Sequence, residues 1–94
     1  MTSLGMPDVY EMRFSNVARR FLVRADRPLR QRLKEALERL REEPKGLPGV
    51  KALYGKFAGH LEYRAGDHRI VYRVQEHDRT IIVIAIGHRR EVYR

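Results

Sequence analysis

The chain has 94 residues, enough for one domain with a thin hydrophobic core, so a deep, enclosed substrate pocket is not expected. It carries 20 Lys and Arg against 12 Asp and Glu, a net charge of +8, which favours a nucleic-acid or ribosomal partner over a generally charged soluble surface. It has no cysteine and no apolar run near the roughly 20 residues that cross a membrane, which excludes disulfides, thiolate metal sites and transmembrane helices and predicts a cytoplasmic location.

The chain begins with a segment that lacks a signal-peptide pattern. We expect residues 1–8 to form a short disordered leader and residues 9–94 to form a single domain. From Val9 to Phe14 apolar and charged residues alternate, which is typical of a half-buried strand.

Two amphipathic helices follow this strand. Ser15 or Asn16 can cap the first helix, because both accept hydrogen bonds from free backbone amides. Asp26 can cap the second helix, and Pro28 suits its first turn. The second helix should end by Glu43, since the proline that follows cannot continue it.

The second half of the chain changes to a period of two, which indicates strands. We predict short extended segments at residues 51–54 and 60–64, and a longer strand at 69–74. Residues 80–86 are apolar on both faces, so we expect an inner strand that is covered on both sides. The order β-α-α-β-β-β predicts an α+β fold, in which the helix pair packs on one face of a mostly antiparallel, twisted sheet.

The other face of this sheet is predicted to be basic. Alternation along the expected strands places polar and charged side chains on it, namely His60, Glu62, Arg64, Arg69 and Arg73. A second basic segment, His88-Arg89-Arg90, follows the last apolar strand. Arginine binds phosphate oxygens through a planar, permanently charged fork, so both segments point to an anionic ligand.

Three segments carry a resemblance to a known family: Lys51-Ala52-Leu53-Tyr54-Gly55, Gly66-Asp67-His68-Arg69-Ile70-Val71-Tyr72 and Gly87-His88-Arg89-Arg90-Glu91-Val92-Tyr93. After this helix pair and at this separation, they resemble the RelE/ParE toxin superfamily from about Tyr10 to Tyr93. The resemblance implies the RelE-like fold, and a type II toxin that is neutralised by a cognate antitoxin. RelE-like members cut messenger RNA in the ribosomal A site, whereas ParE-like members inhibit DNA gyrase without cleaving RNA. We favour the RelE-like activity, and a non-catalytic nucleic-acid-binding domain is the third hypothesis.

The resemblance also implies site residues. The arginine before the Ile-Val-Tyr strand corresponds to Arg69, the arginine after the last strand to Arg89, and the near-terminal tyrosine to Tyr93. Two lysines of the RelE branch fall on His60 and Glu62, a departure that changes charge neutralisers into acid–base groups. The resemblance implies cleavage without a metal or other cofactor, and the four scattered histidines make a weak case for zinc.

Each site residue has a structural alternative. Arg69 and Arg89 would hold the scissile phosphate, unless they form surface salt bridges with Asp67 and Glu91. The acid–base or stacking candidates, in descending order, are Tyr93, His88, His60 and Glu62. Tyr93 can instead pack on the sheet, and Glu62 can instead pair with Arg64 or Arg73. Five further residues are expected to contact RNA phosphates: Lys51, Lys56, Arg64, Arg73 and Arg90.

Overall fold

The structure of the protein is a computed structural model that describes residues 9–89. The predicted leader and residues 90–94 lie outside this range. The elements follow one another in the order β1 (Glu11–Phe14), α1 (Asn16–Arg24), α2 (Arg27–Glu42), β2 (Val50–Ala52), the 3-10 turn η1 (Gly55–Phe57), β3 (Leu61–Ala65), β4 (His68–Gln75) and β5 (Thr80–His88). Neither α-helix of the described residues is long and apolar enough to cross a membrane.

Both helices begin at the predicted caps. Ser15 caps α1, because its Oγ accepts a hydrogen bond from the backbone N–H of Ala18 at 3.0 Å. Asp26 caps α2 by accepting from the N–H of Leu29, also at 3.0 Å. Glu43 forms the C-cap of α2, which confirms the predicted end of this helix.

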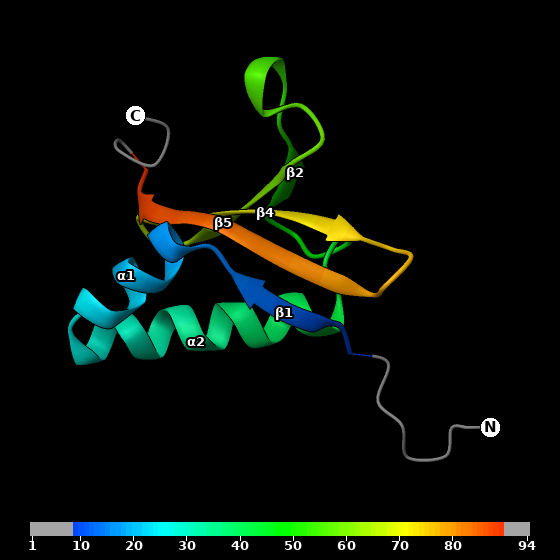
Figure 1. The fold of residues 1–94 in the computed structure, drawn as a ribbon. Coiled ribbons are helices and arrows are strands. Elements are labelled where there is room, and N and C mark those ends of the chain that lie inside the picture. The colour runs from blue at the N-terminus through cyan, green and yellow to red at the C-terminus, as the bar shows by residue number, and fades with distance from the viewer. Residues whose placement is uncertain (1–8, 90–94) are drawn as a thin grey trace, which may run out of the picture.

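The five strands form one sheet in the order β1-β5-β4-β3-β2. Neighbours from β2 to β5 are antiparallel, whereas β1 runs parallel to β5. Both helices lie on the same side of this sheet (Figure 1). The predicted α+β fold with a mostly antiparallel sheet is therefore confirmed. The helix pair connects β1 at one edge of the sheet to β2 at the other edge, and the connection between the parallel strands β1 and β5 runs through both helices and through β2, β3 and β4.

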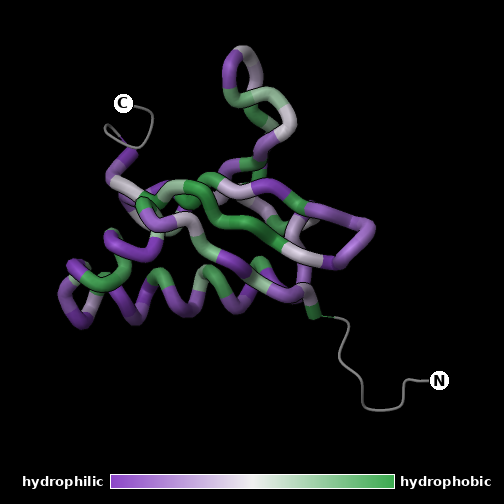
Figure 2. The backbone as a smooth tube through the Cα atoms, viewed as in Figure 1, coloured by the Kyte–Doolittle hydropathy of each residue, from purple (hydrophilic) through white to green (hydrophobic). Residues whose placement is uncertain are grey.

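The hydrophobic core lies between the helices and the sheet. Its largest fully buried side chains are Tyr72, Leu33, Leu40, Ile70, Ile81 and Val83, whereas Val71 is buried on the opposite face of the sheet, across from Glu62. Figure 2 shows the hydrophobic residues concentrated along β5 in the middle of the sheet. The Tyr72 hydroxyl donates to the carbonyl oxygen of Pro44 at 2.5 Å, and burial raises the pKa of Tyr72, so this hydroxyl remains a neutral donor.

A β-bulge changes which residues of β5 face the helices. Val71 pairs with Ala85 and Tyr72 pairs with Val83, so Ile84 is the extra residue in β5. Ile81 and Val83 are fully buried before the bulge, and Ile86 is buried after it. The inner position of this strand is confirmed, but the prediction that both of its faces are covered is wrong. Ile82 and Ile84 remain partly exposed, because the helices cover only one face.

The segment between α2 and β3 differs most from the prediction. The expected strand at residues 51–54 is Val50–Ala52 instead, and η1 follows it. Gly55 has a φ of +67°, which ends the extended backbone there. The loop of residues 53–60 leaves the sheet and projects beyond it (Figure 1).

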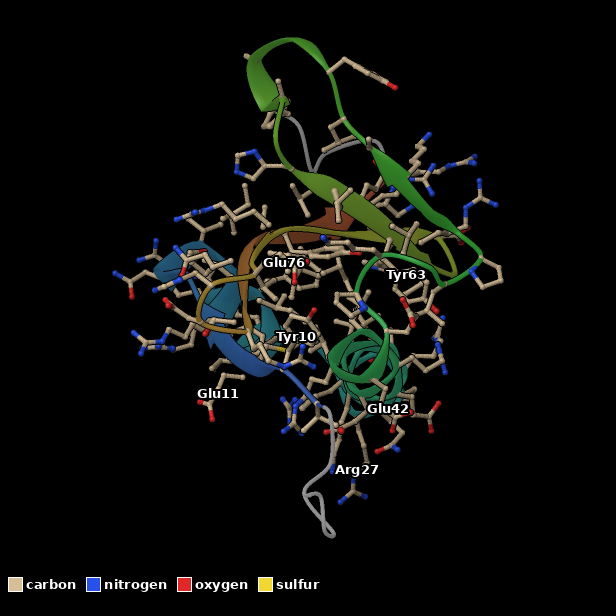
Figure 3. The ribbon with its side chains drawn as sticks, turned by 90° about the vertical axis from the view of Figure 1, so that its right-hand side faces the viewer. Tyr10, Glu11, Arg27, Glu42, Tyr63 and Glu76 are labelled. Carbon is tan, nitrogen blue, oxygen red and sulfur yellow. The ribbon has the colours of Figure 1, made fainter. Side chains whose placement is uncertain are left out.

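A polar cluster holds the start of edge strand β1. The hydroxyl of Tyr10 donates to Glu76 at 3.0 Å, Lys45 forms an ion pair with the same carboxylate, and the guanidinium of Arg79 lies 4.2 Å from the centroid of the Tyr10 ring. Figure 3 shows Tyr10 and Glu76 close together at one end of the molecule. These contacts join β1 to the β4–β5 turn.

Candidate functional site

Four charged side chains gather on the face of the sheet opposite the helices. Strand register places Lys51 of β2 directly across from Glu62 of β3, and Arg64 of β3 directly across from Arg69 of β4. We call these four residues the basic cluster. Their position on three adjacent strands confirms that the open face is basic.

Glu62 lies at the centre of the basic cluster. Its carboxylate is 3.1 Å from Nε of Arg69 and 3.7 Å from Nζ of Lys51, and the residue is only 3% exposed. Arg69 is two residues from the direct partner of Glu62, a diagonal separation that a long side chain bridges. The alternative in which Arg69 pairs with Asp67 is therefore wrong. Sequence analysis recognised the pairing tendency of Glu62 but assigned other partners to it.

The basic cluster has an excess of positive charge. Three cations surround one carboxylate, a net charge of +2, and they line a pocket of about 310 Å³ together with Gly49 and Val50. Arg64 and Arg69 stand directly opposite each other, an arrangement that costs stability when no anion lies between them. The pocket is therefore suited to a phosphate group, whose oxygens both guanidinium forks can bind.

Arg89 directly follows the end of β5. Gly87 pairs with Arg69 on the open face, and Arg89 follows two residues later, just beyond the end of the strand. The backbone N–H of Arg89 donates to the carbonyl oxygen of Asp67 at 2.9 Å, which fixes this position beside the β3–β4 turn. The two arginines identified from the resemblance thus lie at the same end of the sheet.

His88 lies on the helix side of the sheet instead. Its ring is 5.7 Å from the ring of His68, and the ring of His68 is 5.8 Å from that of Phe21 in α1. The structure therefore does not bring His88 into the basic cluster. A strict alternation along β5 would have placed it on the open face, so the bulge is the reason for this outcome.

The other predicted residues are spread around the basic cluster. His60 precedes β3 by one residue, and its Nδ1 is 3.3 Å from the carbonyl oxygen of Phe57. Arg73 lies farther along β4, opposite Ile82, and Lys56 lies in the projecting loop. Tyr93 and Arg90 lie outside the described residues. Among residues 9–89, no three His, Asp or Glu side chains come together in a group that could hold a metal ion.

A second group of arginines lies on the helices, where the helical spacing predicts Arg19, Arg20 and Arg24 on the polar side of the first helix. These exposed residues are Arg19, Arg20, Arg24, Arg27 and Arg32 of α1 and α2. A pocket of about 580 Å³ at α1 includes Arg20 and Arg24 together with apolar side chains such as Val17 and Phe21. It is larger than the pocket in the basic cluster, but it holds no buried ion pair. The pocket in the basic cluster is therefore the better candidate for the functional site, although it is the smaller of the two.

Acid should destabilise the protein through His68. Burial lowers the pKa of His68 below its ordinary value of 6.5, and the charges of His88 and Arg32 act in the same direction, while Asp67 opposes them. The unfolded chain therefore binds a proton more readily, so stability falls as pH decreases below about 6.5. The His68→Phe variant should lose less stability between pH 8 and pH 5 than the wild type does, as measured by urea unfolding. An equal pH dependence in both proteins would contradict the role of His68.

Comparison with known proteins agrees with this fold. Residues 12–93 match the family described as "ParE toxin of type II toxin-antitoxin system, parDE". Toxin RelG of Mycobacterium tuberculosis is 33% identical over 86 residues, which cover 90% of this chain and 97% of RelG.

Solved structures give the same relationship. A chain of the toxin–antitoxin complex RelBE2 of Mycobacterium tuberculosis is 30% identical with a TM-score of 0.75, over 86% of this chain and 99% of that one. A chain of the archaeal RelE–RelB complex of Pyrococcus horikoshii has a TM-score of 0.74 at 22% identity, over 89% of this chain and 99% of that one, and shares the fold.

Proposed function

This chain belongs to the ParE toxin family of type II toxin–antitoxin systems, within the RelE/ParE superfamily, and we propose that it acts as an endoribonuclease on messenger RNA in the ribosomal A site. The observation that carries this proposal is the basic cluster: opposed arginines around a pocket of net charge +2, with Arg89 at the same end of the sheet. The proposal places the reaction in the cytoplasm.

Cleavage by this route makes a 2′,3′-cyclic phosphate. The 2′-oxygen of the ribose attacks phosphorus, a base takes its proton, and the 5′-oxygen leaves as it receives a proton from an acid. Negative charge accumulates on the phosphate oxygens, and preorganised cations usually give the largest single contribution to such a reaction. Arg69 and Arg89 would hold these oxygens, with Arg64 and Lys51 binding neighbouring phosphates.

We assign Glu62 the role of positioning Arg69. A carboxylate that is buried and shared between two cations is poorly placed to take a proton from RNA. His60 is two residues before Glu62, so it is the acid–base candidate nearest to the basic cluster along the chain. Tyr93 remains a prediction for the second acid–base role.

We further propose that a cognate antitoxin binds this chain. The related structures RelBE2 and RelE–RelB are complexes of this kind. A domain of net charge +8 suits an acidic, partly disordered partner segment that folds on contact and blocks access to the basic cluster.

Gyrase inhibition is the second candidate function. The observation that favours it is the ion pair of Glu62 with Arg69, which neutralises part of the charge that phosphate binding needs. The matched family is also described by its ParE members. A ParE-like protein would inhibit DNA gyrase by binding alone.

One experiment separates these functions. The chain is induced in bacterial cells, messenger RNA 5′ ends are mapped, and plasmid supercoiling is measured in the same culture. New 5′ ends at a fixed position within codons support the ribonuclease, whereas lost supercoiling with intact messages supports gyrase inhibition. Co-expression of the protein encoded by the neighbouring gene should restore growth if that protein is the antitoxin.

Binding to RNA should depend steeply on salt. If about four phosphates of single-stranded RNA are neutralised, log K should fall against log[salt] with a slope of about −3. Arg64→Ala removes one exposed cation of the basic cluster, so its slope should be shallower by about 0.7. Arg24→Ala, an equal charge change on α1, is the matched control and should keep the wild-type slope. Equal slopes for the two variants would contradict binding at the basic cluster.

A further inference from the structure

The loop between β2 and β3 is a structured projection. The N–H of Leu53 donates to the carbonyl oxygen of His60 at 3.0 Å, which closes the base of the loop. Within it, the N–H of Ala58 donates to Gly55 at 3.0 Å and the N–H of His60 donates to Phe57 at 3.1 Å. The loop extends away from the rest of the sheet (Figure 1). These hydrogen bonds fix the path of the loop backbone.

The side chain of Tyr54 in this loop is largely exposed to solvent. It is 83% exposed, more than the other exposed large hydrophobic side chains among residues 9–89, Val17 at 56% and Val23 at 70%. Its hydroxyl has no hydrogen-bond partner within the described part of the chain. An aromatic ring that is exposed to this extent suits a binding partner that offers a flat surface.

The charge around Tyr54 indicates what that partner is. Residues 47–61 contain Lys51, Lys56 and His60 and no acidic residue. Tyr54 is three residues from Lys51, so their Cα atoms are at most about 11 Å apart. A few nucleotides of a single strand span this distance. An aromatic ring beside lysines on a projecting loop is a recurrent arrangement for stacking an unpaired base while its phosphates are neutralised.

We propose that Tyr54 stacks on an unpaired base of the RNA whose neighbouring phosphate lies in the basic cluster. This inference rests on the ribonuclease function proposed above. Tyr54 is then a positioning residue, since it fixes the register of the strand over Arg69 and takes no part in the transfer of protons.

The test measures binding of a single-stranded oligoribonucleotide whose 2′-O-methyl groups prevent cleavage. Stacking contributes about 1–3 kcal/mol per base, so Tyr54→Ala should weaken binding about 5- to 150-fold. Tyr54→Phe keeps the ring and should bind close to wild type. Val23→Ala removes another exposed apolar side chain, on α1, and should leave affinity unchanged. A 2-aminopurine base in the oligonucleotide should lose fluorescence on binding to wild type and Tyr54→Phe but not to Tyr54→Ala.

The outcomes separate this inference from the proposed function. If Tyr54→Ala binds as wild type while Arg64→Ala binds more weakly, the basic cluster binds RNA without Tyr54 and the inference is wrong. If the wild-type chain does not bind the oligonucleotide at all, both are wrong. If Tyr54→Ala keeps its RNA affinity but no longer binds the protein encoded by the neighbouring gene, Tyr54 belongs to a protein interface and the inference is again wrong.

Discussion

Replacing Arg89 with alanine should lower the rate of RNA cleavage about 100- to 1,000-fold, the usual cost of removing one preorganised donor from a developing oxyanion. Arg89 is exposed at the end of β5 and forms no ion pair with any residue between 9 and 89. Its loss should therefore leave the thermal unfolding midpoint almost unchanged. Cleavage of a ribosome-bound message and thermal unfolding are measured on the same preparation.

Arg27→Ala is the matched control for this variant. Arg27 is also exposed and lies at the start of α2, on the helix side of the molecule. This control should cleave RNA at the wild-type rate. A folded Arg89→Ala protein with the same activity as the control would remove Arg89 from the site.

Replacing Arg69 with alanine should destabilise the fold as well as the site. The substitution leaves the buried carboxylate of Glu62 with its exposed partner Lys51 at 3.7 Å, and breaking a buried pair in this way costs roughly 3 kcal/mol. The double variant Glu62→Gln/Arg69→Ala should recover most of this loss, because no charge is then stranded. Its cleavage activity should stay low, since the guanidinium is still absent.

Urea unfolding of the wild type, Glu62→Gln, Arg69→Ala and the double variant measures the coupling between Glu62 and Arg69. Arg64→Ala is the control, because Arg64 faces Arg69 across the strands without an ion pair among the described residues. Removing it should cost little stability, or add some through relief of repulsion. If Arg69→Ala is as stable as wild type, Arg69 does not stabilise the buried carboxylate of Glu62.

The helices and the order of the elements could be predicted from sequence because their signals are local. Ser15 and Asp26 cap helices through atoms only three residues away, and the proline after Glu43 ends α2 by itself. Apolar alternation was enough to place the strands that support the basic cluster. These features need no knowledge of distant contacts.

The parts that failed depend on contacts between distant residues. No local signal distinguishes Ile84 as a bulge, yet this one residue decides that His88 lies beside His68 on the helix side of the sheet. The partner of Glu62 depends on the diagonal register between β3 and β4. For Tyr54 the period of two along residues 51–54 suggested an extended strand, whereas β2 ends at Ala52 and Tyr54 lies in the projecting loop.

The parallel pairing of β1 with β5 has a consequence for how the chain folds. β5 is the last strand in sequence but lies between β1 and β4, so the sheet has no continuous ladder until β5 is in place. Pairing Glu11 with Thr80 closes a loop that contains most of the chain, a non-local step that slows folding. Loss of β5 from the sheet would therefore separate β1 from β4, β3 and β2, whereas loss of an edge strand would only narrow the sheet. The domain should behave as one cooperative unit, in which local damage near the C-terminal strand becomes global unfolding.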